Sequence, residues 1–265
     1  MSSPNKLTIS RWHLDCITPQ GDFFLGETIS VRSGSVQINL LSGISGLKQT
    51  VDRKLTVAFK EVLPIVTGPE INWICPPLQL SGQWDAIVPR FERTLFADES
   101  QIIDWHCAGP KTKVRLQIGS DKSLAGIGYV DHVRIAAENW SAPISEIRFG
   151  RFLTEQESWI WINLDGVFSR PWVWRNGVEQ PLAAVSDDLI TLGDGHTLGL
   201  VHKHPIREGQ FGDTVVQSLP ALRPLVPQGM ARIFESTWMS KGTLLKSTEK
   251  IDSGWALHQR IRFPG

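Results

Sequence analysis

The sequence predicts an all-β protein, and three features lead to that prediction. Short runs in which polar and apolar residues alternate recur along most of the chain, as they do in strands with one buried face. The 23 glycines and 16 prolines are spread over the whole length, which suits many tight turns. Only residues 47–60 offer a helix, and the β-branched side chains of Val51, Thr56 and Val57 leave helix and strand both open there.

The predicted strands begin with a hairpin near the N-terminus. Residues 22–32 alternate, a Ser-Gly-Ser turn follows at 33–35, and residues 36–40 alternate again. An Asn-Gly pair at 176–177 marks a second tight turn after a strand at 172–174. Further strands are predicted at residues 111–118, 158–164, 196–204, 214–219, 231–238 and 255–263.

The charge balance excludes several classes of partner. The chain has 27 basic and 27 acidic side chains, so it offers no excess of positive charge for nucleic-acid phosphates or for an anionic membrane surface. No stretch approaches the roughly 18 apolar residues that span a bilayer. We therefore expect no nucleic-acid partner and no transmembrane segment.

A cytoplasmic location is expected from the N-terminus and from the cysteines. The first ten residues, MSSPNKLTIS, lack the apolar stretch of a secretory leader. Cys16, Cys75 and Cys107 form no closely spaced pair, and their odd number fits reduced thiols.

The length allows two domains. A chain of 265 residues can form one large β domain or two of roughly 130 residues each. Glycine and polar residues at 118–124 interrupt two strand-like stretches. We therefore expect an N-terminal domain at residues 1–122 and a C-terminal domain at residues 123–265.

The aromatic composition is unusual, because the chain has 11 tryptophans and a single tyrosine. Tryptophan offers broad, stiff faces that suit the lining of an elongated apolar cavity. Tryptophans that simply fill a β core are an equally good interpretation.

The chain's only tyrosine lies in the segment Gly-Ile-Gly-Tyr-Val-Asp-His at residues 126–132. On a strand, alternation places Tyr129 and Asp131 on one face with apolar neighbours, and His132 on the other. A carboxyl group on an apolar face pairs with a cation, accepts hydrogen bonds, or stays protonated. In the last case Asp131 is a Brønsted acid, whereas in the first two it is structural, bonded for example to Tyr129, Arg134 or Arg148. The spacing leaves both interpretations open.

This segment resembles the G-x-G-Y-x-D-H segment of the carotenoid 1,2-hydratase (hydroxyneurosporene synthase) family. The sequence departs from the family pattern at Val133, where asparagine is expected, at Arg134-Ile135, which replaces Trp-Gly, and at Phe149, which replaces tryptophan. Weaker similarity to the family covers the segments Trp12-His13-Leu14-Asp15, Gly82-Gln83-Trp84, residues 104–110 and residues 148–151.

The resemblance implies two lipocalin-like, calycin-type antiparallel β-barrels packed together and a long apolar substrate of the isoprenoid or polyene type. Asp131 would protonate a double bond, Tyr129 would hydrogen-bond Asp131, and His132 would support the site from the other strand face. The outcome would be hydration, cyclisation or isomerisation, without a cofactor. The residues expected to contact the substrate are Trp84, Trp105, Trp161, Trp174 and Arg151.

Two alternatives to this enzyme remain. A tryptophan-lined barrel can carry a carotenoid, a tetrapyrrole or a lipid without chemistry, collecting it through transient contact with a membrane. His196, His202 and His204 share one strand parity, which is a spacing found in metal sites of β-barrels. However, Pro205 is expected to end that strand, and loop or surface histidines are the simpler interpretation, so no metal site is predicted.

Overall fold

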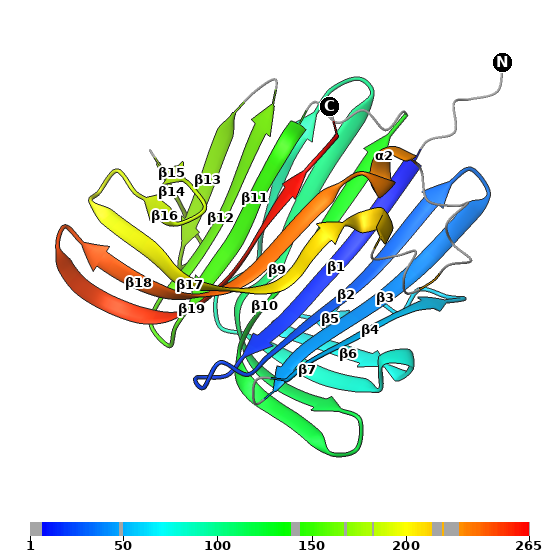
Figure 1. The fold of residues 1–265 in the computed structure, drawn as a ribbon, viewed down its shortest axis with the longest axis horizontal. Coiled ribbons are helices and arrows are strands. Elements are labelled where there is room, and N and C mark those ends of the chain that lie inside the picture. The colour runs from blue at the N-terminus through cyan, green and yellow to red at the C-terminus, as the bar shows by residue number, and fades with distance from the viewer. Residues whose placement is uncertain are drawn as a thin grey trace. The chain divides into compact units, whose positions relative to one another are not determined.

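The computed structural model describes residues 7–47, 50–138, 144–166, 169–181, 183–213, 219 and 228–264. These residues form two antiparallel sheets, one in each of two compact units, Met1–Trp140 and Ser141–Gly265 (Figure 1). The predicted all-β fold with two lipocalin-like antiparallel units is confirmed.

The first unit contains a ten-stranded sheet among its described residues. The strand order is β4-β3-β2-β1-β10-β9-β7-β6-β5, and β8 pairs with β9. A short 3-10 helix, η1 (Pro76–Leu78), connects β6 to β7. The strands are β1 (Leu7–Ile17), β2 (Phe23–Ser33), β3 (Val36–Leu47), β4 (Thr50–Ala58), β5 (Ile65–Thr67), β6 (Glu70–Cys75), β7 (Leu80–Ala86), β8 (Phe91–Ala97), β9 (Gln101–Ile118) and β10 (Lys122–Ala137).

The second unit contains a nine-stranded sheet in the order β14-β13-β12-β11-β19-β18-β17-β16-β15. Apart from β8, this is the strand order of the first unit, with β11 in the place of β1 and β19 in the place of β10. The elements are β11 (Ile144–Leu153), β12 (Ser158–Gly166), β13 (Arg170–Arg175), β14 (Val178–Gln180), β15 (Ala184–Val185), β16 (Leu189–Thr191), β17 (His196–Gln210), α2 (Gln228–Ala231), β18 (Phe234–Lys246) and β19 (Glu249–Arg262).

Each unit has its own apolar core. The sheet of the first unit curls (Figure 1). Leu41 of β3, Trp73 of β6 and Trp84 of β7 are fully buried in one cluster. In the second unit Phe152 and Trp161 belong to a separate buried cluster. Each of these large side chains contributes roughly 1.5–3 kcal/mol by leaving water, so each unit carries a substantial hydrophobic stabilisation of its own.

Three local expectations are decided by the structure. Residues 50–58 form β4 and not a helix, in keeping with their β-branched side chains. β17 continues through Pro205, because shifts of register on both sides of the proline accommodate its missing N–H. Most of the strand expected at 214–219 lies outside the described residues, since only residue 219 is described.

The stretch at 118–122 is a hairpin turn and not a connection between the units. Lys122 of β10 pairs with Ile118 of β9, and β10 also pairs with β1 along most of its length. The two units divide after Trp140, whereas the sequence led us to expect a boundary after residue 122. Tyr129 and Asp131 consequently belong to the first unit.

Neither η1 nor α2, nor any other helix among the described residues, is long and apolar enough to cross a bilayer. The thiols of Cys16, Cys75 and Cys107 are buried and form no disulfide in this part of the chain, as expected for reduced cysteines.

Candidate active site

A row of polar side chains crosses four adjacent strands of the first sheet. Glu27 of β2 lies opposite His13 of β1, His13 lies opposite Asp131 of β10, and Asp131 lies opposite Cys107 of β9. Directly opposed residues of an antiparallel pair point to the same face, so the row shares one face of the sheet. All four residues are buried, with Asp131 only 3% exposed.

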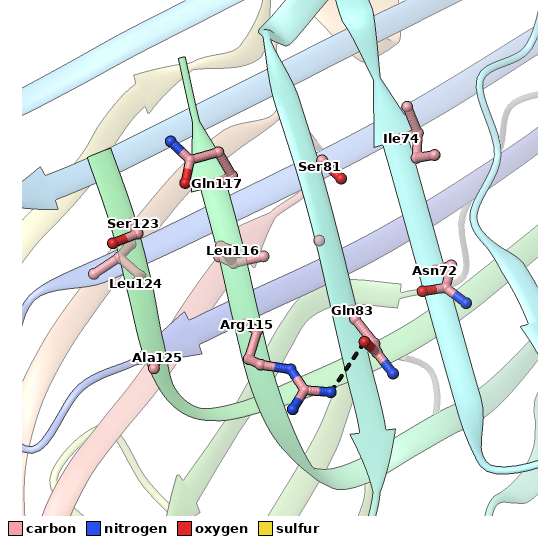
Figure 2. Close-up of a pocket in the computed structure, with 11 residues that line it drawn as sticks. Asn72, Ile74, Ser81, Gln83, Arg115, Leu116, Gln117, Ser123, Leu124 and Ala125 are labelled. Carbon is pink, nitrogen blue, oxygen red and sulfur yellow. Dashed lines mark hydrogen bonds between the residues drawn. The ribbon is translucent and has the colours of Figure 1, made fainter. Parts of the chain in front are cut away.

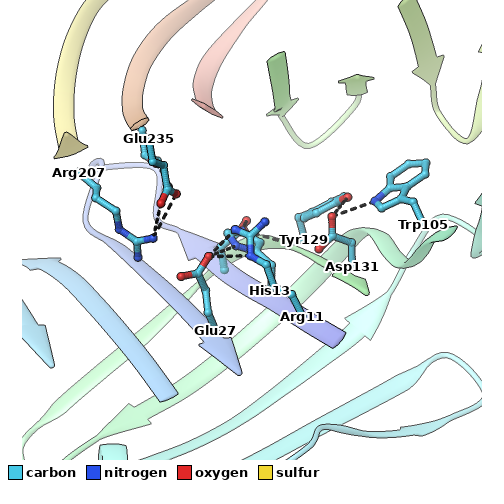
Figure 3. Close-up of polar contacts among 10 residues, drawn as sticks. Arg11, His13, Glu27, Trp105, Tyr129, Asp131, Arg207 and Glu235 are labelled. Carbon is cyan, nitrogen blue, oxygen red and sulfur yellow. Dashed lines mark hydrogen bonds and ion pairs between the residues drawn. The ribbon is translucent and has the colours of Figure 1, made fainter. Parts of the chain in front are cut away.

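Asp131 is held by two donors that bond the same oxygen. The Tyr129 hydroxyl and the Trp105 indole Nε1–H each donate to Asp131 Oδ2 over 2.9 Å (Figure 3). The other oxygen, Oδ1, is buried and accepts no hydrogen bond from the described residues, and no cation among them contacts the carboxyl group. When Asp131 is protonated, Oδ1 is therefore the oxygen that carries the proton, because Oδ2 already accepts two bonds.

Burial keeps the neighbours of Asp131 protonated. The pKa of Tyr129 is raised well above its usual value of 10.0, first by burial and then by the nearby Asp131 and Cys107. Burial followed by the charge of Asp131 also raises the pKa of the Cys107 thiol well above 9.0. Tyr129 thus acts as a permanent donor to Asp131, and Cys107 is an unreactive thiol rather than a nucleophile.

An irregularity in strand pairing shapes this part of β10. The β9–β10 register shifts between Gly128 and Val130 and again before Asp131, and Pro110, which has no N–H, lies in the part of β9 that bulges. The Tyr129 backbone N–H donates to Asp15 Oδ1 over 3.0 Å. A side chain at Gly128 would place its Cβ 2.1 Å from the Asp15 carbonyl oxygen, so only glycine allows the two strands to approach this closely.

Asp15 connects β1 to several parts of the site. Its carbonyl oxygen accepts a bond of 2.7 Å from the Trp84 indole Nε1–H, and its Oδ2 lies 3.1 Å from His13 Nε2. His13 Nδ1 in turn lies 3.7 Å from Glu27 Oε1, and Glu27 pairs with Arg11. Trp84 was expected at the site from the sequence, whereas Arg11, His13, Asp15 and Glu27 were not. Their signal was the alternation of Arg11, His13 and Asp15 with apolar residues in β1, which places three ionisable groups on one strand face.

His132 lies on the opposite face of β10 from Asp131. It is directly opposite Trp12, on whose ring it stacks with 4.5 Å between centroids, and its Nε2 lies 2.8 Å from Ser10 Oγ. Burial first, and then the charges of His106 and Arg134, lower the pKa of His132 to about 4. His132 is therefore neutral near pH 7 and touches neither Asp131 nor Tyr129 in the described contacts.

The structure distributes the other expected substrate contacts over both units. Trp105 bonds Asp131, while Trp84 fills the core of the first unit and reaches Asp15. Trp161 fills the core of the second unit. Trp174 of β13 and Arg151 of β11 are buried in the second unit at 3% and 2% exposure. Of these five residues, Trp84 and Trp105 belong to the same unit as Asp131.

An open groove lies elsewhere on the first sheet and is not lined by any of the expected site residues. It has a volume of about 500 Å³ and crosses β6, β7, β9 and β10 (Figure 2). Arg115 donates to Gln83 within it over 3.0 Å, and the lining combines amide and hydroxyl groups with a larger share of apolar surface.

The three histidines considered as metal ligands lie on β17. The register shift between Val201 and His204 breaks their common parity. His196 is buried and contacts Asp194 and Arg175, whereas His202 and His204 are exposed. No group of three side chains suited to a metal occurs within the described ranges.

Comparisons with known proteins establish the fold. No family model matches the chain, and no curated protein sequence matches it. A protein from Nitrosomonas europaea given the provisional name AttH superposes with a TM-score of 0.55 at 8% identity, covering 98% of this chain and 93% of that one. CghA, in a structure with Sch210972, superposes with a TM-score of 0.54 at 10% identity, covering 98% and 89%. Kievitone hydratase from Nectria haematococca superposes with a TM-score of 0.53 at 10% identity, covering 96% and 88%. At such low identity these likenesses define a shared fold only.

Proposed function

We propose that this protein is an enzyme that transforms an apolar isoprenoid or polyene substrate by acid-initiated chemistry without a cofactor. Asp131 is the acid, and one observation carries the proposal. A buried carboxyl group has two donors on Oδ2, no cation beside it in the described contacts, and an Oδ1 that accepts no bond there. In the proposed acid form of Asp131 the proton lies on Oδ1, which no donor among the described residues occupies.

In the proposed reaction Oδ1–H of Asp131 protonates one carbon of a carbon–carbon double bond. The two π electrons form the new C–H bond, the other carbon becomes a carbocation, and Asp131 becomes a carboxylate. Tyr129 and Trp105 stabilise that carboxylate, because hydrogen bonds to a charged acceptor are stronger than those to a neutral one. Tryptophan faces stabilise the cation through their ring electrons.

The fate of the cation decides the product. Attack by water followed by return of its proton to Asp131 gives hydration. Attack by a second double bond closes a ring and leaves a new carbocation, and loss of a proton from that cation to Asp131 completes cyclisation. Loss of a neighbouring proton from the first cation to Asp131 gives isomerisation. All three courses regenerate the acid, so the proposal covers them together. A cytoplasmic location and transient contact with a membrane that stores the substrate belong to the same proposal.

The shared fold supports a small-molecule substrate. Kievitone hydratase is by name a hydratase, and CghA was crystallised with the small molecule Sch210972. Folds of this kind host different reactions, so the site and not the fold supports the role of Asp131.

The test is deuterium incorporation into two probes, neurosporene and kievitone, incubated with the protein in heavy water and analysed by mass spectrometry. We expect the wild type to add deuterium to a carbon of at least one probe. Asp131→Asn keeps the acceptor for Tyr129 and Trp105 but has no acidic proton, so we expect a loss of at least a hundredfold. Asp104→Asn, a change at a carboxyl group on β9 that bonds Thr94, is the matched control. Equal incorporation by wild type and Asp131→Asn would rule out the proposal.

Binding without chemistry is the second candidate. Asp131 Oδ2 is fully bonded by Tyr129 and Trp105 without a substrate, which is also the arrangement of a structural carboxyl group. If the wild type retains unchanged neurosporene through gel filtration and incorporates no deuterium, the protein is a carrier.

A further inference from the structure

His13 is a buried histidine between two carboxylates, on the sheet face that carries Asp131. Its Nε2 lies 3.1 Å from Asp15 Oδ2, and its Nδ1 lies 3.7 Å from Glu27 Oε1. A neutral imidazole has one N–H, whereas the imidazolium ion has two and can face an acid on either side. The geometry therefore favours the protonated ring.

The charges around His13 support the protonated form. Burial opposes its charge, but the hydrogen bond to Asp15 and the nearby carboxylate of Glu27 outweigh burial and raise the pKa of His13 above 6.5. The described groups that face His13 are Arg11 and Asp15 from β1, Glu27 from β2, and Tyr129 and Asp131 from β10. With His13 protonated, the positive charges of Arg11 and His13 balance the negative charges of Asp15 and Glu27.

Asp15 links His13 to Tyr129, the tyrosine that donates to Asp131. One Asp15 oxygen faces His13, and the other accepts the backbone N–H of Tyr129 over 3.0 Å. Tyr129 has no paired residue in the β1–β10 register or in the β9–β10 register. The Asp15 side chain therefore accepts the Tyr129 N–H in place of a backbone carbonyl of a neighbouring strand. The hydroxyl group of the same tyrosine then donates to Asp131.

We propose that His13 is a positioning residue, whose imidazolium ion fixes Asp15 and, through the Tyr129 backbone, sets the hydrogen bond from Tyr129 to Asp131. Loss of the His13 proton removes the N–H that faces Glu27 and loosens Asp15, so the Tyr129–Asp131 bond changes with pH. The catalytic meaning of this device rests on the function proposed above, but the coupling itself is a property of the folded chain.

The chain offers a built-in reporter, because Tyr129 is its only tyrosine. The full-length protein labelled with 13C at tyrosine Cζ gives one resonance, which responds to the hydrogen bond of the hydroxyl group. We expect this resonance to shift between pH 5.5 and 9 with a midpoint above 6.5. The shift should vanish in His13→Gln and persist in His106→Gln, a change at a partly exposed histidine beside Glu92.

Asp15→Asn is the second variant, and it stays informative if His13→Gln does not fold. It keeps an acceptor oxygen for the Tyr129 N–H but removes one charge opposite His13, so the midpoint should fall by about one pH unit or more. The proposal is overturned by a wild-type resonance that does not titrate. It is equally overturned by a titration that persists in His13→Gln, which would belong to another group such as Asp131, or by an unchanged midpoint in Asp15→Asn.

The activity assay adds an independent arm. If neurosporene or kievitone is a substrate, His13→Gln should lower kcat about tenfold with KM unchanged, and the alkaline fall of the wild-type pH profile should disappear. An unaltered pH profile would overturn the positioning role. Because the tyrosine resonance needs no substrate, a failure of the proposed function is distinguished from a failure of this inference.

Discussion

The chemistry proposed for Asp131 depends on a few residues that meet from distant parts of the chain. Strand parity alone places Tyr129 beside Asp131. Trp105 comes from β9, and Asp15 comes from β1, more than a hundred residues away along the chain. In the proposed reaction the two donors on Oδ2 stabilise the carboxylate that proton transfer leaves on Asp131.

Tyr129→Phe tests the weight of one donor. It removes the hydroxyl bond to Asp131 Oδ2 and leaves Trp105 as the other donor, so we expect a loss of about 1–2 kcal/mol in the free energy of unfolding. The rate of deuterium incorporation should fall about tenfold, since the carboxylate formed by proton transfer loses stabilisation. Urea denaturation and the heavy-water assay measure the two effects. A rate equal to wild type would make Tyr129 purely structural.

At the scale of elements, β10 departs from regular strand pairing at the candidate site. Its register slips against β9 around Tyr129, and glycine at 128 lets β1 come close enough for Asp15 to reach the Tyr129 N–H. The alternation in the sequence correctly predicted which side chains share a face, but it did not predict the bulge. Register shifts depend on the partner strand, here with Pro110 in β9, and no pattern within β10 reveals them.

Gly128→Ala tests this close approach. Its Cβ would lie 2.1 Å from a backbone oxygen of β1, which cannot move aside as a side chain can. We expect a loss of at least about 2 kcal/mol in the free energy of unfolding, measured by urea denaturation.

Gly43→Ala is the control in the same sheet. A Cβ there would meet Leu78 Cδ1 at 3.6 Å, which is ordinary contact, so its stability should stay within about 0.5 kcal/mol of wild type. Equal stabilities for the two variants would contradict the tight approach of β1 and β10.

At the scale of the whole molecule, the two units repeat one strand order, and each packs a histidine against a tryptophan and a serine of a neighbouring strand. In the first unit His132 of β10 contacts Trp12 and Ser10 of β1. In the second unit His258 of β19, the strand in the position of β10, contacts Trp238 and Ser240 of β18, which takes the place of β9 and not of β1. Burial is the main cause that lowers the pKa of each histidine to about 4.

This repetition predicts how stability depends on pH. The unfolded chain protonates His132 and His258 near 6.5, whereas the folded chain does so near 4. Between these values the unfolded state binds more protons, so the free energy of unfolding must fall as the pH is lowered from 6.5 to about 4. The pKa of His13 is raised above 6.5 in the folded chain. Its contribution to the free energy of unfolding is therefore complete below pH 6.5 and is lost only as the pH rises through the raised pKa.

Urea denaturation at several pH values, followed by tryptophan fluorescence, measures this dependence. The double variant His132→Gln/His258→Gln should show a flatter decline between pH 6.5 and 4. His202→Gln, a change at an exposed histidine of β17, should follow the wild type. A decline of unchanged slope in the double variant would assign the acid sensitivity to other groups.

The sequence by itself determined the all-β class, most strand positions, and the placement of Tyr129 and Asp131 on one face opposite His132. These features follow from a period of two along the chain, which is a local property. Only the tertiary structure brought Trp105, Asp15 and His13 to the site and assigned β10 to the first sheet. Pairing between distant strands decides such contacts. It depends on register, bulges and the burial of both partners, and the alternation within a single strand contains none of these.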